Sequence, residues 1–393
     1  MVGLAMRIVG IESTIVEIPL REPVRGVHGV ISVQSSVLVR VLADEGVEGW
    51  GDVDPTPGYT LESVDDIHAA VGRLSSALLG VDAFNTHRAL VLMDETTAGH
   101  FEAKAAIEMA LLDLKGRALG VPVHSLLGGR LVDEVPLNAW IGAVPPAQAA
   151  REAADWLARG FTTAKIKVAG PHPEGIERVA AVRAAVGNRM ALRVDFNESL
   201  APDDAVPFIR ALVPFDLTLV EQPVTRDRID ALAEIRRKIT IPLMADESVT
   251  SPASLIEIIK REAADIVKVK AMKQGGLLRT RSMVDCAAAA GLRVVIGHGF
   301  GLALSTLAEA TLAATSAAVL PGCEAVGPLK MAADVVVEPI DLGHGVLKLP
   351  DGAGLGASVD PRALARHRRL ELPRERGRGY HPGIARRARR TSR

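Results

Sequence analysis

Aromatic side chains and cysteines are scarce in this sequence. Phe, Trp and Tyr make up 3% of the 393 residues, and Cys286 and Cys323 are the two cysteines. A disulfide-stapled scaffold is therefore excluded, and the core must be built mainly from aliphatic and alanine side chains. Both cysteines lie in apolar segments of small residues, where we expect buried free thiols in a reducing compartment.

Long uninterrupted apolar runs are also lacking. Residues 1–20 are broken by Arg7, Glu12 and Glu17, so they do not have the charged segment and continuous apolar core of a secretory signal, and they favour a strand. The most apolar stretch, 299–322, contains several hydroxyl side chains and Glu309, which is typical of a helix inside a fold and not of a membrane span. These features predict a soluble, cytoplasmic protein.

Neither charge sign is in excess over the whole chain, but the charges are unevenly distributed. The formal net charge is -1, from 46 Lys plus Arg and 47 Asp plus Glu. Residues 361–393 contain 12 Arg and two acids, a net charge of +10, which leaves -11 for residues 1–360. Arginine-rich ends of this kind are commonly disordered and attract polyanions without sequence preference, so the tail predicts no specific nucleic-acid partner.

The composition that remains is that of a globular protein. With 48% hydrophobic and 24% charged residues, general disorder, collagen and coiled-coil classes are excluded. Residues 6–54 alternate apolar and polar positions between glycine turns, which predicts an antiparallel meander. From about residue 61 apolar residues recur at three-and-four spacing, which predicts helices. Residues 1–130 are therefore expected to form an α+β domain.

From residue 136 onwards, short β-branched or apolar runs alternate with helical stretches. Eight such runs occur, namely PLNAWIG, TTAKIKV, MALRVD, LTLVE, IPLMA, DIVKVK, RVVIG and CEAVG. This alternation predicts a parallel sheet with right-handed crossovers, and eight units favour a closed β/α barrel over an open doubly wound sheet. We place the barrel at 131–328, a C-terminal segment that packs on the first domain at 329–360, and a basic, disordered tail at 361–393.

Ionisable residues at the ends of six successive strand candidates are spaced by one βα unit. The intervals are 28, 26, 25, 24 and 28 residues, and the residues are Lys167, Asp195, Glu221, Asp246, Lys270 and His298. The carboxyl ends of barrel strands meet at one rim, where active sites are built. We therefore expect these six side chains around a single site.

Three of these residues are carboxylates on neighbouring strands: Asp195, Glu221 and Asp246. Their mutual repulsion would be costly without a cation, and an all-oxygen ligand set selects Mg²⁺ or Mn²⁺ over zinc. An isolated acid more often pairs with a surface Arg or Lys. Three acids in register on apolar strands favour a metal site instead.

Lysines flank the three acids on two sides. Lys165 and Lys167 share one face of a strand, whereas Lys270 lies four strands further on, with Lys268 and Lys273 close in sequence. A lysine beside other cations loses its proton more readily and can act as a general base. The alternative role, as counterions of the acids, explains Lys268 and Lys273 well but Lys167 and Lys270 poorly.

Two opposed bases beside a metal predict removal of the proton α to a substrate carboxylate, with the metal stabilising the enediolate. Reprotonation from the opposite face would invert the carbon. If a β leaving group is present, the same intermediate expels it. The residues therefore predict the first half-reaction and leave the second open.

Longer motifs resemble the enolase superfamily, specifically the muconate lactonizing enzyme subgroup of the mandelate racemase and muconate lactonizing enzyme family. The resemblance spans residues 6–360, and its motifs are AAIEMALLDLKGRALGVPVHSLLGG (105–129), AKIKV, RVDFNES, VEQP (220–223), MADES (244–248), K-x-x-K-x-G-G (270–276) and DGAGLG (351–356). It implies an α+β capping domain over a modified TIM barrel of the (β/α)₇β type. It also implies Mg²⁺ on Asp195, Glu221 and Asp246, with Lys167 and Lys270 as acid/base residues.

The resemblance assigns supporting residues as well. Lys165 looks like the auxiliary lysine expected to contact the substrate carboxylate, while Asn197 and Glu247 match positions that orient ligands or water. Specificity in this family is expected from two loops of the capping domain, here 24–32 and 52–60. His28 and Tyr59, one in each loop, are candidates for substrate contact or for structural loop roles.

The segment GHGFG (297–301) differs from family members that carry a Met-Leu-Glu type segment or an Asp-x-Asp motif at this place. His298 matches, by strand position, the histidine base of mandelate racemase, but Lys270 replaces the aspartate that should be its partner. We therefore expect His298 to hydrogen-bond the substrate, with a structural role at this glycine-rich turn as the alternative.

The leading hypothesis is an isomerase that racemises or epimerises an α-substituted carboxylate, most simply an amino acid derivative. The alternative within the same chemistry is a muconate-type cycloisomerase or a dehydrating lyase similar to o-succinylbenzoate synthase. A non-catalytic scaffold is a more distant alternative, and the full set of acids and lysines argues against it. The resemblance also implies a homo-oligomer.

Overall fold

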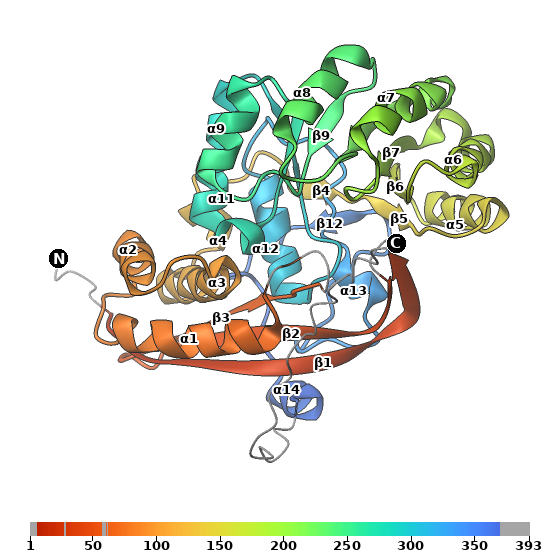
Figure 1. Cartoon of the computed structure of the whole chain (residues 1–393). Coiled ribbons are helices and arrows are strands. Elements are labelled where there is room, and N and C mark those ends of the chain that lie inside the picture. Colours follow the sequence, from red (N-terminus) through yellow and green to blue (C-terminus); the bar gives the residue numbers. More distant parts are fainter. Residues whose placement is uncertain (1–5, 27–28, 57–59, 61, 370–393) are drawn as a thin grey trace, which may run out of the picture.

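The computed structural model describes residues 6–26, 29–56, 60 and 62–369. An antiparallel sheet and its helices lie on one side of the molecule, and a curled parallel sheet surrounded by helices lies on the other (Figure 1). This arrangement confirms the predicted barrel with an α+β domain beside it. Within the described residues, no helix is both long and apolar enough to cross a membrane.

The antiparallel sheet consists of β1 (Ile8–Gly26), β2 (Gly29–Ala43) and β3 (Glu48–Val53). The predicted meander over 6–54 is therefore present, but its first two strands are longer than the sequence pattern indicates. The segment 24–32, expected as a loop, is largely the end of a β-hairpin, with Val24 paired to Ile31. We call residues 24–26 and 29–33 the hairpin end.

Helices α1 (Val64–Leu78), α2 (Thr86–Thr96) and α3 (Phe101–Leu119) follow, and α1 and α3 pack against this sheet (Figure 1). Helix α1 begins at a capping box of Ser63 and Asp66. Helix α3 lies so close to β3 that a Cβ atom at Gly49 would be 2.1 Å from the carbonyl oxygen of Ala110. Only glycine permits this approach, which holds α3 against the antiparallel sheet, while α3 also contacts α10 (Ala271–Gln274) of the barrel.

The parallel sheet has seven strands in the order β11-β10-β9-β8-β7-β6-β5, so each strand neighbours the next one in sequence. Its strands are β5 (Ala139–Ile141), β6 (Thr163–Lys167), β7 (Ala191–Asp195), β8 (Leu217–Glu221), β9 (Leu243–Ala245), β10 (Ile266–Val269) and β11 (Arg293–Ile296). The helices between and after them are α5 (Pro146–Ala158), α6 (Pro173–Val186), α7 (Pro202–Ala211), α8 (Ile229–Lys238), α9 (Pro252–Lys260), α10 (Ala271–Gln274), α11 (Leu277–Ala289) and α12 (Ala303–Ala313). One βα unit therefore advances the chain by one strand.

The eighth strand candidate, CEAVG, is not a regular strand. Residues 318–324 instead form single hydrogen-bonded bridges to β11 on one side and to residues 136–138 on the other. Pro321 has no N–H to donate, and Arg193 donates to the carbonyls of Pro321 and Gly322, so the ladder is interrupted there. The chain then enters α13 (Gly327–Lys330) directly.

Residues 331–360 connect the barrel to the antiparallel sheet and its helices. Strand β12 (Val346–Lys348) pairs with β4 (Glu134–Pro136), while Gly354 bridges to Pro122, just before the short helix α4 (Val123–Leu126). One cluster of buried apolar side chains runs through both regions, from residue 6 to residue 355. The boundaries placed at 130 and 328 therefore stay predictions, because the core is continuous across them.

The first part of the basic tail is ordered, so the prediction of disorder from residue 361 is wrong for 361–369. Asp360 caps α14 (Pro361–His367), and Leu364 packs against a second apolar cluster that includes residues of β1. Arg369 then forms an ion pair with Asp65. The capping residue Asp360 and the packed side chain of Leu364 stabilise this short helix. Residues 370–393 lie outside the described residues.

Candidate active site

The six residues of the regular spacing lie at the carboxyl-terminal rim of the parallel sheet. Lys167, Asp195 and Glu221 end β6, β7 and β8, and Asp246 and Lys270 directly follow β9 and β10. Lys167 pairs with Asp195 across the sheet, and Asp195 pairs with Glu221. Residues that follow one another in the regular spacing therefore lie next to one another at the rim.

A cavity of about 450 Å³ opens at this rim. Its floor is formed by charged side chains of the strand ends, and its wall by the hairpin end, by residues 298–300 and by residues near α13. The described lining residues are Val24, Val30, Ile31, Ser32, Val33, Thr56, Asn138, Trp140, Ile141, Gly142, Lys165, Lys167, Asp195, Asn197, Asp246, Lys268, Lys270, His298, Gly299, Phe300, Glu324, Val326 and Lys330. The floor and the wall thus come from different parts of the chain.

Asp195 is a fully buried acid between two lysines. The Nζ atom of Lys167 lies 2.7 Å from Asp195 Oδ2, and that of Lys165 lies 3.1 Å from the same oxygen. Burial alone would raise the pKa of Asp195, but the two ammonium groups outweigh it and hold that pKa well below its ordinary value. Asp195 is therefore an anion at neutral pH.

Glu221 is equally buried and less well compensated. Lys165 Nζ lies 3.1 Å from Glu221 Oε2, and Lys268 Nζ lies 3.0 Å from Oε1. Burial, together with the charge of Asp195, nevertheless raises the pKa of Glu221 to about 8 against the effect of both lysines. Burial of Glu221 beside the charge of Asp195 therefore outweighs the two neighbouring ammonium groups.

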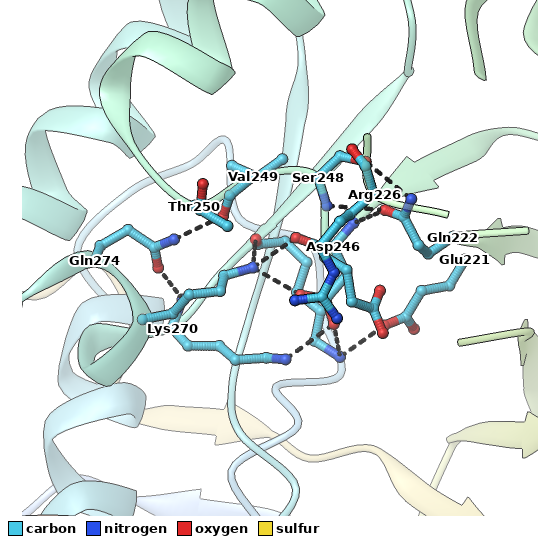
Figure 2. A network of polar contacts seen from close by, with 12 residues as sticks. Glu221, Gln222, Arg226, Asp246, Ser248, Val249, Thr250, Lys270 and Gln274 are labelled. Carbon is cyan, nitrogen blue, oxygen red and sulfur yellow. Dashed lines mark hydrogen bonds and ion pairs between the residues drawn. The ribbon is translucent and has the colours of Figure 1, made fainter. Parts of the chain in front are cut away.

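Asp246 lies beside Lys270, which follows the neighbouring strand β10 (Figure 2). Its carboxylate accepts hydrogen bonds from Lys270 Nζ at 2.9 Å and from Lys273 Nζ at 2.7 Å. Burial raises the pKa of Asp246, but these two lysines lower it well below its ordinary value. The side-chain oxygen of Gln222, from the VEQP motif, accepts the backbone N–H of Asp246 at 2.9 Å and so positions this turn.

The three carboxylates fit a divalent cation by the chemistry of their donors. They are buried, they supply oxygen alone, and they come from adjacent strand ends. As they stand, the described residues contain no group of three His, Cys, Asp or Glu side chains spaced to hold a metal ion. The ammonium groups of Lys165 and Lys268 lie between the carboxylates and provide positive charge there.

The two candidate acid/base lysines come from opposite parts of the sheet. Lys167 ends β6, and its Nζ also donates to Asn197 Oδ1 at 2.5 Å. Lys270 follows β10, four strands away, and its backbone N–H is held by Gln274 (Figure 2). Burial, with the nearby charges of Lys268 and Lys273, lowers the pKa of Lys270 to about 8 despite the opposing effect of Asp246. A lysine with this pKa can exchange protons near neutral pH.

Asn197 and Glu247 link the two sides of the floor. Asn197 accepts from Lys167 and donates through Nδ2 to Glu247 Oε1 at 2.9 Å. The other oxygen of Glu247 is buried and has no hydrogen-bond partner among the described residues. Burial, and then the charge of Asp246, raises the pKa of Glu247 to about 7. A buried oxygen of this kind can still accept a hydrogen bond.

His298 lines the cavity and is buried. Its ring is hydrogen-bonded to the backbone of Asp54, and its Nε2 has no partner among the described residues. Burial, with the charges of Lys270 and Lys330, lowers the pKa of His298 well below its ordinary value. A neutral imidazole with a free nitrogen is suited to hydrogen bonding with a ligand and not to holding a proton at neutral pH, and the predicted contact of His298 with the substrate stays a prediction.

The two loop candidates, His28 and Tyr59, lie outside the described residues. Parts of the loops that carry them do reach the cavity. Val24 and Ile31 from the first loop and Thr56 from the second line its wall. The prediction that these two segments face the ligand site is therefore supported for the described residues.

Two charged residues of the cavity were not found from the sequence. Glu324 pairs with both Lys165 and Lys268, and these lysines outweigh burial and lower its pKa to about 2. It follows His298 by 26 residues, so the regular spacing continues to it and could have found it. Lys330 lies in α13, outside that spacing, and has no such signal.

Comparison with known proteins places these features in a family. Residues 10–128 match the description "Mandelate racemase / muconate lactonizing enzyme, N-terminal domain", and residues 148–363 match "Enolase C-terminal domain-like". The chain is 33% identical over 363 residues to N-succinyl-L-Arg/Lys racemase of Bacillus cereus, covering 91% of this chain and 97% of that protein.

Solved structures agree with this result over nearly whole chains. Muconate lactonizing enzyme from Pseudomonas fluorescens, complexed with muconolactone, has a TM-score of 0.90 and 30% identity, and the match covers 93% of this chain and 100% of that one. A dipeptide epimerase from Enterococcus faecalis, complexed with Mg and the dipeptide L-Leu-L-Tyr, has a TM-score of 0.86 and 30% identity, with 90% and 100% covered. These similar proteins are a racemase, a cycloisomerase-type enzyme and an epimerase, all isomerases.

Proposed function

Because the chain belongs to the mandelate racemase/muconate lactonizing enzyme family of the enolase superfamily, whose members are generally dependent on a divalent metal, we propose that it removes the proton α to a substrate carboxylate with Mg²⁺. The substrate we favour is an amino acid derivative, which is racemised or epimerised. The observation that carries this proposal is the pair of lysines, Lys167 and Lys270, on opposite sides of three buried carboxylates.

Asp195, Glu221 and Asp246 would hold the Mg²⁺ ion. When bound, the ion supplies positive charge against the charge that develops on the substrate carboxylate. Lys165, whose Nζ forms ion pairs with Asp195 and Glu221, would contact that carboxylate. The floor thereby offers oriented positive charge where the enediolate forms, which is usually the largest contribution to catalysis. Mn²⁺ fits the same oxygen donors.

Lys167 and Lys270 would move the proton. The neutral amine of one lysine takes the α-proton from one face of the substrate, and the ammonium of the other returns a proton to the opposite face. The number of protons in the site is unchanged, and the carbon is inverted. The pKa of Lys270, lowered to about 8, leaves both of its protonation states accessible near neutral pH.

The test is α-proton exchange in D₂O with Mg²⁺. N-succinyl and N-acetyl amino acids, dipeptides, betaines and cis,cis-muconate would be incubated with the protein, and deuterium at the α carbon and optical rotation would be followed. We expect exchange with inversion for one class. A lack of exchange with every member of this panel, in protein shown by calorimetry to bind Mg²⁺, would contradict the proposal.

A second candidate function is cycloisomerisation or β-elimination, similar to dehydrating lyases of the o-succinylbenzoate synthase kind. It is favoured by the TM-score of 0.90 to a muconate lactonizing enzyme that holds muconolactone. It shares the enediolate: β-elimination forms it by removing the α-proton, whereas cycloisomerisation forms it by ring closure and then protonates the α carbon. Ring closure or loss of a β substituent without inversion of the recovered substrate would distinguish it from racemisation.

We further propose a cytoplasmic homo-oligomer that acts on small molecules. The compartment is supported by two cysteines that are both free thiols, one of them buried. The oligomer rests on family likeness alone. Size-exclusion chromatography with light scattering would measure the assembly, and a mass equal to one chain would contradict it.

A further inference from the structure

The wall of the cavity is largely apolar and contains one described cation. Besides the charged floor, its lining includes Val24, Ile31 and Val33 of the hairpin end, together with Trp140 and Phe300. Lys330 is the one charged side chain among the described residues of this wall. A ligand that fills the cavity therefore meets, besides the charged floor, apolar surface and the ammonium group of Lys330.

The position of Lys330 results from tight packing of α13. A Cβ atom at Gly327 would lie 2.1 Å from the backbone nitrogen of Gly301, so only glycine lets α13 lie against the segment that follows β11. Lys330 is thereby buried, with 7% of its surface exposed, and its Nζ donates to the carbonyl of Gly299. Nζ also lies 4.3 Å from the ring centre of Phe300 and 4.5 Å from that of Trp140.

Lys330 differs from the lysines of the floor in its lack of a counterion. Lys165, Lys167, Lys268 and Lys270 each form an ion pair with at least one carboxylate. Among the described residues, no carboxylate forms an ion pair with Lys330. An ammonium group has three N–H donors, and the carbonyl of Gly299 occupies one.

A buried cation without a counterion is costly, because two aromatic rings replace only part of its hydration. Burial, and then the charges of Lys167 and Lys165, lowers the pKa of Lys330 to about 7. This part of the cavity is therefore short of negative charge in the free protein. An anionic group bound there would restore the balance.

We propose that Lys330 determines substrate specificity by binding a second anionic group of the substrate, at the end remote from the reacting carboxylate. The inference rests on the proposed function and narrows it to dianions, such as an amino acid whose N-acyl chain ends in a carboxylate. Trp140 and Phe300 hold the ammonium in place. A substrate with a cationic far end is disfavoured, because two like charges would meet in a buried site.

The test compares two substrates that differ only in the charge of the group remote from the reacting carbon. An N-succinyl amino acid from the active class and its analogue with the terminal carboxylate replaced by the neutral amide would be assayed by α-proton exchange. Wild type is expected to prefer the acid by about 10- to 100-fold in kcat/KM, as for a hydrogen bond to a charged group. Lys330→Met should remove that preference, mainly by raising KM for the acid, and Lys330→Arg should retain it.

Lys348→Met serves as the control, because Lys348 is exposed on β12. Thermal unfolding of each variant shows whether it folds. Equal turnover of both substrates by wild type, or an equal loss for both in Lys330→Met, would overturn the proposal and leave the proposed function standing. If wild type exchanges no α-proton at all, the proposed function fails. Calorimetry would then still test the role of Lys330. Wild type should bind the acid more tightly than the amide, and Lys330→Met should bind the two equally.

Discussion

The floor and the wall of the cavity are built by different rules. On the floor, charged residues come from successive strand ends at intervals of 24 to 28 residues, and each lysine there is paired with an acid. The wall is largely apolar and comes mainly from the hairpin end and from segments around residues 299 and 326. Among its described residues it holds one lysine without an ion pair, Lys330. Under the proposed function, the floor performs proton transfer and the wall selects the substrate. Changes in the two regions should therefore affect different kinetic constants.

The largest effect is expected from the two lysines of the floor. Lys167→Met or Lys270→Met should lower racemisation by about 10²- to 10⁴-fold, the usual contribution of general acid/base catalysis. Each variant should still exchange the α-proton of the one enantiomer that faces the remaining lysine. Deuterium incorporation, measured separately for the two enantiomers, checks this.

Lys260→Met is the matched control for these variants, because Lys260 is exposed on α9, away from the cavity. If both floor variants kept wild-type turnover, the proposed proton transfer by Lys167 and Lys270 would be wrong. The floor and the wall would then no longer differ in function.

The next effect concerns the metal. Mg²⁺ that binds the folded protein alone should stabilise it by about 2.7 kcal/mol at a concentration 100-fold above its dissociation constant. Glu221→Gln should lose this stabilisation, because a neutral amide replaces one buried anionic ligand. Thermal unfolding with and without MgCl₂, together with calorimetry, measures it. Glu257→Gln, at an exposed acid of α9, should behave like wild type, and equal Mg²⁺ stabilisation in Glu221→Gln would remove Glu221 from the ligands.

A smaller effect is expected from the wall. Ile31→Ala removes apolar surface from the hairpin end and should raise KM by about 10-fold with little change in kcat, as is typical of small changes in a hydrophobic pocket. Steady-state exchange kinetics measure both constants. Val9→Ala, at an exposed valine of the same sheet, should change neither. A fall in kcat with KM unchanged for Ile31→Ala would show that the wall takes part in the chemical step.

The smallest effect is a pH dependence of stability from His298. Its folded-state pKa is well below the ordinary value of about 6.5, so the unfolded chain takes up a proton that the folded chain refuses. Wild type should therefore lose stability relative to His298→Asn as pH falls below about 6.5, by up to about 1.4 kcal/mol per pH unit. Denaturant unfolding at several pH values measures it.

The control for this measurement is His87→Asn, since His87 is exposed on α2. It should not change the pH dependence of unfolding. A parallel pH dependence in wild type and His298→Asn would show that His298 takes up its proton in the folded state as well.

The floor was predictable from the sequence because a repeat unit has a fixed geometry. One βα unit advances the chain by one strand, so acids and lysines at a constant interval must meet at one rim. The same interval extends to Glu324, although the segment around it is not a regular strand. The predicted roles of Asp195, Glu221 and Asp246 as metal ligands, and of Lys167 and Lys270 in proton transfer, stay predictions.

The sequence alone thus determined the fold class and which charged residues share the rim, since both follow from spacing along the chain. Tertiary structure decided the rest. It extended β1 and β2 into the hairpin end, ordered α14, and brought Lys330 between Trp140 and Phe300. These contacts depend on packing between segments far apart in the chain, such as Trp140 and Lys330, and such packing leaves no periodic pattern in the sequence.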